Sequence, residues 1–268
     1  MYGALVTALD SLFRPRTSAP SAATVLRSML WPAAILSIIH RSVVLTTNGN
    51  ITDDFKPVYR ALQNFRHGLD IYNEHLDYVD PHYLYPPGGT LLMAPFGYLP
   101  ATESRYLFIA CNTIAIVIAA YVLLRMFNFA VTSVAAPALL LAMVCTETVT
   151  NTLVFTNING CILLLEALFF KWLLDGIPAR QWWAGVAIGL AVVVKPVLLP
   201  LLLLPLLNRQ WRAVVAGLVV PAVFNLAALP LVSNSRDFFT RTLPYLMGTR
   251  DYFNSSILGN GVYFGLPS

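Results

Sequence analysis

Long apolar runs alternate with short polar segments along most of this chain. A helix needs roughly 20 predominantly apolar residues to cross a bilayer. Shorter transmembrane helices also occur in polytopic proteins around a binding or catalytic site, so the shorter runs are kept as spans. The runs lie at about residues 28–46, 106–124, 133–147, 158–174, 183–194, 196–207 and 213–232, with a short one at 89–99. The pattern predicts an all-α polytopic membrane protein.

The composition agrees with a membrane protein. The chain is 57% hydrophobic and only 11% charged, with a mean hydropathy of +0.66, whereas a soluble globular chain is roughly 25% charged. Its net charge of +4 comes from basic clusters at the ends of apolar runs, which indicates lipid headgroups and not nucleic acid. An odd number of cysteines without a CxxC pair argues against a disulfide framework or a metal site. We expect these cysteines to be packing residues; they are Cys111, Cys145 and Cys161.

Basic residues set the expected orientation in the membrane. If residues 1–27 are a cytoplasmic tail and 89–99 does not cross, the cytoplasmic ends carry the basic residues that the positive-inside rule requires. These are Arg27, Arg125, Lys171, Arg180, Arg209 and Arg212. The transmembrane core would be residues 28–268, and we expect further spans after residue 268.

This orientation brings four polar stretches to the outer face of the membrane. They are 50–88, 148–160, Lys195 and 233–268. Outer loops are polar simply because water is there, which explains each stretch taken alone. Their convergence from distant parts of the sequence instead predicts a site that faces outward.

The segment NITDDFKPVYRALQNF, residues 50–65, predicts an amphipathic helix. Apolar residues recur at helical spacing from Phe55, Asp54 stands at the N-cap position, and Gly68 ends the pattern. Asp54 would cap this helix, and a capping carboxylate is also held rigidly enough for catalysis. Asp53 stands beside it as a possible assistant. We expect the helix to lie at the membrane interface with its basic residues toward the headgroups; they are Lys56, Arg60 and Arg66.

Two other outer segments hold candidate binding residues. Lys195 is the only charged residue between Gly189 and Leu207, and a lysine there is costly unless it reaches water, headgroups or an anion. A phosphate ligand and snorkelling to the interface both explain it, and the proline that follows predicts a break between two helices. Asn157 and Asn159 lie in TNING at the start of a run, where they either cap the next helix or bind a sugar.

The remaining polar segments are less specific. Residues 74–82 combine carboxylates and imidazoles, but their spacing matches no defined metal site. We therefore expect no metal cofactor and keep a bound divalent cation as the weaker alternative. The C-terminal segment holds aromatic rings and polar groups that suit a sugar surface or an ordinary interfacial loop. Its polar candidates are Arg241, Arg250, Asn254, Ser255 and Asn260.

Several of these residues together resemble a known family. The order Asp-Phe-x-x-Val-Tyr after the first span, then Gly-x-x-x-Tyr, then Tyr-Pro-Pro before Ala-Pro, is similar to the membrane glycosyltransferases of family 87, which have the GT-C fold. TNING and the Lys-Pro pair at 195–196 also lie where that family has polar positions. The residues that carry the resemblance are Asp54, Phe55, Val58, Tyr59, Gly68, Tyr72, Tyr85, Pro86, Pro87, Ala94 and Pro95.

The resemblance covers the whole chain, includes the family's arabinofuranosyltransferases, and implies a reaction. The donor would be decaprenyl-phospho-arabinofuranose, and the acceptor would be a growing arabinan of arabinogalactan or lipoarabinomannan. Transfer would invert the anomeric centre at the outer, periplasmic face of the plasma membrane and create α(1→3) branches. The fold would be a GT-C transmembrane bundle with amphipathic interfacial helices in its first outer loop.

The resemblance also implies roles for individual residues. Asp54 matches the family's catalytic carboxylate and would take the proton of the acceptor hydroxyl, with Asp53 as a possible assistant. Lys195 would stabilise the leaving lipid phosphate, with Arg250 and Arg241 in reserve. The residues expected to bind the sugar or the acceptor are Tyr59, Tyr85, Asn157, Asn159, Asn254, Ser255 and Asn260.

Two alternatives stay open. A lipid-linked sugar flippase or a small-solute transporter would explain the spans and Lys195, but transporters typically show matching halves, and the sequence shows no such internal repeat. A mannosyltransferase that uses polyprenyl-phospho-mannose would share the family and the mechanism. The residues alone do not separate a five-membered from a six-membered sugar ring.

Overall fold

The structure, a computed structural model, describes residues 21–45, 53–77, 81–248, 261 and 264–265. Regular structure in this part of the chain is entirely helical, which confirms the predicted all-α class. The elements are α2 (Ala22–Ile39), η1 (His40–Val44), α3 (Phe55–Arg66), α4 (Pro87–Met93), η2 (Ala94–Tyr98), α5 (Ala101–Met126), α6 (Ala135–Val144), α7 (Glu147–Val154), α8 (Asn159–Leu174), α9 (Pro178–Val194), η3 (Pro196–Leu202), α10 (Leu203–Leu207), α11 (Trp211–Ala228), η4 (Phe238–Thr242) and α12 (Leu243–Met247).

Not every apolar run forms a helix that could span a membrane. Three helices in the described part of the chain are long and apolar enough, namely α2 with η1, α5 and α11. The run at 133–147 forms α6, which is bent by 62° against α7, so this pair is a broken span or a re-entrant loop. The helices α8 and α9 have 16 and 17 residues, and the run at 196–207 is a 3-10 segment followed by one short helix. The protein is therefore a multi-pass membrane protein with fewer long spans than apolar runs.

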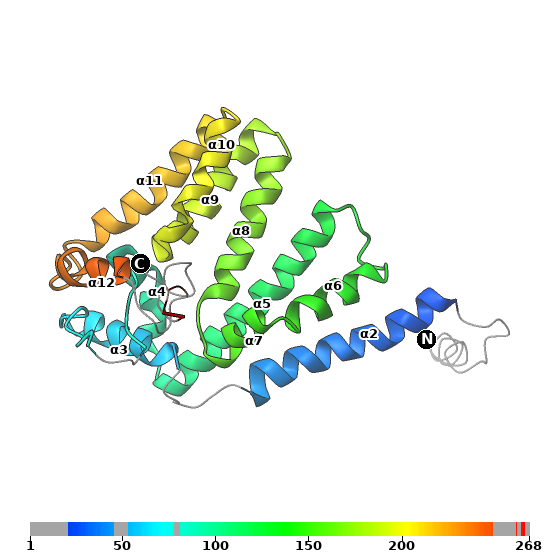
Figure 1. Ribbon diagram of the computed structural model, residues 1–268, viewed down its shortest axis with the longest axis horizontal. Helices are drawn as coiled ribbons and strands as arrows, with labels where there is room; N and C mark the ends of the chain where they lie inside the picture. The colour runs from blue at the N-terminus through cyan, green and yellow to red at the C-terminus, as the bar shows by residue number, and fades with distance from the viewer. Residues whose placement is uncertain (1–20, 46–52, 78–80, 249–260, 262–263, 266–268) are drawn as a thin grey trace, which may run out of the picture.

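Close helix packing forms the centre of the bundle. Figure 1 shows α9 beside α8 and α11, and α8 also packs on α5. Glycines of α9 permit this approach, because a Cβ on Gly185 would collide with the Ala213 carbonyl oxygen and one on Gly189 would lie 2.8 Å from the Cβ of Val220. Small residues at helix contacts are usual in membrane bundles, where no hydrophobic effect drives helices together. Helix α2 packs on α6 at the side and keeps most of its large apolar side chains exposed, as lipid contact requires.

The predicted amphipathic helix is α3. It buries Phe55, Val58 and Leu62, and Gly68 adopts a φ of +68° after its end, as predicted. A residue with a side chain is strained at such a φ, so glycine suits this position. The basic residues Lys56, Arg60 and Arg66 are exposed; their contact with headgroups stays a prediction.

Two further predictions about chain breaks are confirmed. The segment at 89–99 forms α4 and η2, which are too short to cross and pack against α11 and α3. Helix α9 ends at Lys195, whose φ of −128° and ψ of 87° are not helical.

At the N-terminal side, α2 begins at Ala22, inside the predicted tail at 1–27, and is capped by Ser21. The cytoplasmic location of that tail stays a prediction. The cysteines are free thiols.

Candidate active site

The described parts of the polar stretches that were predicted to share one face meet at one end of the bundle. Ser233 Oγ donates to the Gly68 carbonyl at 2.6 Å, and Asn234 Nδ2 donates to Asp70 Oδ2 at 3.0 Å. The segments before α3 and α8 and the end of α9 are joined there by hydrogen bonds as well, at the end of the bundle where α3 and α4 lie in Figure 1. The convergence is confirmed, while the side of the membrane stays a prediction.

Asp53, and not Asp54, is the aspartate whose side chain caps α3. Asp53 is only 1% exposed, and its Oδ1 accepts the Phe55 N–H at 3.0 Å. Asp54 occupies the N-cap position by sequence, but its side chain makes no capping hydrogen bond. The prediction of a capping Asp54 side chain was therefore wrong. An aspartate readily bonds the backbone N–H two residues on, and burial of Asp53 at this point makes such a partner necessary.

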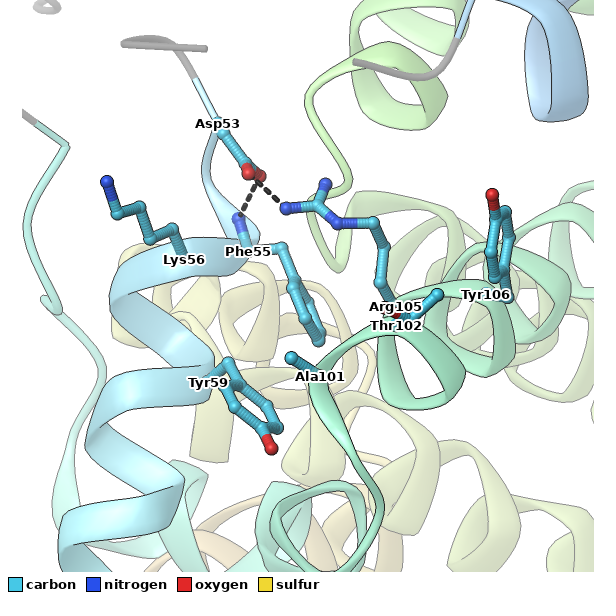
Figure 2. A pocket seen from close by; sticks show the side chains of 8 residues that line it. All are labelled: Asp53, Phe55, Lys56, Tyr59, Ala101, Thr102, Arg105 and Tyr106. Atoms are coloured by element: carbon cyan, nitrogen blue, oxygen red, sulfur yellow. Dashed lines mark hydrogen bonds and ion pairs between the residues drawn. The ribbon is translucent and has the colours of Figure 1, made fainter. Parts of the chain in front are cut away.

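Arg105 of α5 is the charged partner of Asp53. Its Nη2 forms an ion pair and hydrogen bond with Asp53 Oδ2, its Nη1 donates to Thr156 Oγ1 at 3.3 Å, and its guanidinium lies 5.0 Å from the centroid of the Phe55 ring (Figure 2). Arg105 therefore links Asp53, which precedes Asp54, to Thr156, which precedes Asn157. Arg105 is not evident as a site residue from the sequence, because an arginine at the edge of an apolar run looks like an ordinary headgroup anchor.

Asp54 is turned toward the start of α8. Its backbone N–H donates to the Phe155 carbonyl at 3.0 Å, and its Oδ2 accepts a hydrogen bond from Asn157 Nδ2 at 3.3 Å. The other end of the Asn157 amide accepts the backbone N–H of Asn159 at 3.0 Å, so Asn157 also caps α8. Asn159 Oδ1 in turn accepts a hydrogen bond from Lys195 Nζ. A continuous polar chain thus connects a carboxylate to an ammonium across three segments.

The surroundings of Asp54 make its carboxylate more basic. Burial raises the pKa of Asp54 above its ordinary value, and the neighbouring charge of Asp53 acts in the same direction more weakly. The hydrogen bond from Asn157 and the positive charge of Lys195 lower the pKa and partly offset this effect. A carboxylate with a raised pKa is a better proton acceptor, provided that the pH is high enough to keep it ionised.

Lys195 has a polar partner inside an apolar stretch. It is half-buried between α9 and η3, bonded to Asn159 and close enough to Asp54 and Glu166 to interact with both carboxylates. A lysine ammonium carries three N–H donors, and the bond to Asn159 uses one of them. The site therefore holds a cation and a carboxylate, each fixed by a hydrogen bond to an asparagine.

The two tyrosines predicted to bind sugar differ in their hydroxyl groups. The Tyr59 hydroxyl donates to the Leu99 carbonyl at 3.0 Å, so toward a ligand it can offer its ring and an acceptor oxygen but no donor. Tyr85 is half-buried and lies close enough to Asp54 for their charges to interact. Burial raises the pKa of Tyr85, which keeps its hydroxyl protonated and able to donate.

The C-terminal candidates are only partly described. Arg241 Nη1 donates to the Tyr72 carbonyl at 3.1 Å and its Nη2 to the Glu74 carbonyl at 3.0 Å, so Arg241 holds the loop after α3 in place. A role in phosphate binding for Arg241 stays a prediction. The other candidates lie outside the described residues; they are Arg250, Asn254, Ser255 and Asn260.

The segment at 74–82 contributes local contacts. His82 Nδ1 lies 3.4 Å from Glu74 Oε2, which also accepts the Tyr83 N–H at 2.9 Å. Within the ranges that the structure describes, no three side chains of His, Cys, Asp or Glu converge in a way that could hold a metal ion. Glu74 thus fixes the chain around the aromatic residues that precede α4.

A pocket of about 370 Å³ lies directly beside the Asp53–Arg105 pair. Figure 2 shows that α3 provides one side of it and the first turns of α5 the other. Asp53 and Phe55, which flank Asp54 in the sequence, both contribute to its wall. Of its lining residues, only Asp53 and Tyr59 are among the site residues predicted from the sequence; the others are Phe55, Lys56, Ala101, Thr102, Arg105 and Tyr106.

The sequence has named relatives. It is 76% identical to an α-(1->3)-arabinofuranosyltransferase of Mycobacterium tuberculosis strain H37Rv, over all of this chain and 64% of that protein. Proteins of the same name from Mycolicibacterium smegmatis and Corynebacterium glutamicum are 66% and 46% identical. They match 100% and 90% of this chain, over 64% and 57% of their own lengths. The chain thus spans somewhat less than two thirds of these relatives. No solved structure matches it significantly.

The comparison with protein families covers most of the chain. The sequence pattern of glycosyltransferase family 87 matches residues 83–268. This range includes Arg105, Asn157, Asn159 and Lys195, and the matched segment is joined to Asp54 by the hydrogen bond from Asn157. The sequence resemblance that pointed to the same family is thereby confirmed: the chain belongs to glycosyltransferase family 87.

Proposed function

We propose that this chain carries the catalytic residues of an inverting arabinofuranosyltransferase. The enzyme would move D-arabinofuranose from decaprenyl-phospho-arabinofuranose to a growing arabinan and form α(1→3) branches in arabinogalactan or lipoarabinomannan. The names of the relatives support the sugar and the linkage. The observation that carries the proposal is the polar chain Asp54–Asn157–Asn159–Lys195, because it holds a base and a cation in one site.

Asp54 acts as the general base. An acceptor hydroxyl is a weak nucleophile until its proton is removed, and a positioned base contributes about 10²–10⁴-fold to such reactions. As it loses its proton to Asp54, the acceptor hydroxyl oxygen attacks the anomeric carbon from the face opposite the lipid phosphate, which inverts the configuration. Asn157 orients the carboxylate through its hydrogen bond to Oδ2.

Lys195 stabilises the leaving group. The bond between the anomeric carbon and the phosphate oxygen breaks, and negative charge develops on the lipid phosphate. A fixed cation that meets developing charge in a site shielded from water lowers the barrier without reorganising during the reaction. Asn159 Oδ1 accepts one N–H of the Lys195 ammonium. The other two N–H groups of this ammonium bind the phosphate oxygens.

The site faces the outer side of the membrane in this proposal. The basic residues Lys171 and Arg180 lie at the opposite end of α8 and near the start of α9, and the positive-inside rule assigns that end to the cytoplasm. A donor that is already activated by its phosphate requires no nucleotide. The polyprenyl chain lies between apolar helices, where water does not compete.

The test is transfer by the full-length protein in lipid nanodiscs, with decaprenyl-phospho-arabinofuranose and an arabinofuranosyl oligosaccharide. Asp54→Asn is expected to reduce kcat by at least about 10²-fold, with the protein still inserted and folded. Lys195→Met is expected to raise the donor KM. Asp175→Asn, in a charged cluster at the far end of α8, is the matched control and should leave both constants unchanged.

Contrary outcomes are distinct. Wild-type turnover in Asp54→Asn would remove the base assignment, and an unchanged donor KM in Lys195→Met would leave Lys195 as an interfacial lysine. Transfer from polyprenyl-phospho-mannose, without transfer from the arabinose donor, would favour the mannosyltransferase. Movement of the lipid across the bilayer without glycosidic product would favour the flippase.

A further inference from the structure

We propose that the pocket between α3 and α5 binds the acceptor glycan, at the sugar residue next to the one that carries the reacting hydroxyl. The pocket measures about 370 Å³, within the roughly 300–1,000 Å³ usual for small-molecule sites. This inference rests on the proposed function and adds a binding site for a neutral furanoside chain. It gives Tyr106 and Thr102 a role in specificity.

The chemistry of the pocket suits an uncharged polyol. Tyr106 is 52% exposed at its edge, and the half-buried Tyr59 ring lies on the opposite side, so that aromatic surface is available for the apolar face of a sugar. The exposed Thr102 adds a hydroxyl. Aromatic rings with a few polar groups that fix orientation are typical of ligand pockets.

The charges in the pocket do not favour an anion such as a phospholipid headgroup. The guanidinium of Arg105 is neutralised by Asp53 and bonded to Thr156, both of which hold it in the wall. Lys56 supplies one further positive charge, on an exposed and flexible side chain. A single exposed ammonium is a weak phosphate site compared with the paired guanidinium forks that phosphate sites commonly use.

The position of the pocket matches the geometry of an inverting reaction. Its walls come from the start of α3, the preceding Asp53 and the first turns of α5, and none of its lining residues belongs to α8, α9 or η3. Lys195, which binds the leaving phosphate in the proposed mechanism, lies between α9 and η3, and Asn159, which holds its ammonium, begins α8. Asp54 connects the two groups, because its sequence neighbours Asp53 and Phe55 line the pocket and its Oδ2 accepts the hydrogen bond from Asn157. In-line displacement places the nucleophile and the leaving group on opposite sides of the anomeric carbon, so the acceptor belongs on the α3–α5 side.

The test separates acceptor binding from donor binding. Tyr106→Ala should raise the acceptor KM about fivefold, the effect of losing one ring contact, with little change in the donor KM. Thr102→Trp fills the pocket and should raise the acceptor KM further. Both side chains are exposed, so neither change should unfold the protein. Tyr121→Ala is the matched control, because Tyr121 is 51% exposed on the same helix but about 22 Å further along it.

A direct measurement of acceptor binding tests the pocket independently of catalysis. Saturation-transfer NMR with an arabinofuranosyl oligosaccharide and the Asp54→Asn protein should show binding that Thr102→Trp abolishes and Tyr121→Ala preserves. If Asp54→Asn proves fully active, the proposed base is wrong, while this binding result still stands. A rise in the donor KM alone would assign the pocket to the donor. Unchanged acceptor binding in both pocket variants would overturn the proposal. It would also be overturned if the pocket substitutions left acceptor binding intact and only added anionic phospholipid abolished it.

Discussion

Two charged clusters lie at opposite ends of α8 and use the same kinds of side chain to different effect. At the end of α8 and start of α9, Lys171 and Arg180 pair with Asp175 within ten positions of sequence, and the side chains of all three keep a quarter or more of their surface exposed. At the other end, Arg105 pairs with Asp53, whose side chain has no exposed surface, and the partners are 52 positions apart.

The difference shows what burial adds to an ion pair. An exposed pair is screened by water and contributes little, whereas removal of one partner of a buried pair leaves an uncompensated charge. The Asp53–Arg105 pair therefore fixes the backbone of the two segments that hold Asp54 and Asn157, through Asp53 next to Asp54 and Thr156 next to Asn157. The cluster at the far end holds only a turn between two helices.

The largest effect is expected from breaking the buried pair. Arg105→Met leaves Asp53 charged and without its guanidinium, and should lower the free energy of unfolding by about 3–5 kcal/mol. The double variant Asp53→Asn/Arg105→Met removes both charges and should recover most of this loss. Thermal unfolding of the detergent-solubilised protein measures both. An unchanged midpoint in Arg105→Met would mean that the pair contributes no more than its exposed counterpart.

A smaller effect is expected at Asp54, the proposed base. Asn157→Ala removes the hydrogen bond that lowers the pKa of Asp54, so this pKa rises further above its ordinary value. A base acts only when ionised, and the acidic limb of the kcat–pH profile should therefore move to higher pH.

The control for this pH shift is Asn208→Ala. Asn208 is an exposed asparagine after α10, and its side chain bonds the Leu204 carbonyl. Its profile should match that of the wild type. A limb that stays in place, or moves to lower pH, in Asn157→Ala would contradict the assignment of Asp54 as the titrating base.

The smallest effect is expected at the far end of α8. Arg180→Met breaks the exposed pair with Asp175 and should change the free energy of unfolding by only about 0–1 kcal/mol. The same thermal assay, run with and without added salt, measures this change. A loss as large as that of Arg105→Met would show that exposure does not separate the two clusters.

Local pattern determined the helical class of this protein, its membrane character and several site residues. The stripe from Phe55 to Phe65 gave the bounds of α3, because helical periodicity depends only on neighbours in sequence. Lys195 and TNING stood out since polar groups in apolar runs are costly. The runs at 158–174 and 183–194 were already shorter than a straight span needs, but their ends were not determined by the sequence pattern: α9 begins at Pro178, because helix ends depend on what packs against them.

Only the tertiary structure decided which of two adjacent aspartates is structural. Asp53 and Asp54 are adjacent and chemically identical, and the position of Asp54 directly before the helical pattern predicted that its side chain caps the helix. Burial and a guanidinium from a distant helix made Asp53 the capping and paired residue, and left Asp54 to face Asn157 and the cation beyond it. The pocket next to them is likewise built from α3 and α5 together. Ion pairing and cavity shape depend on contacts between segments far apart in sequence, and no local pattern contains that information.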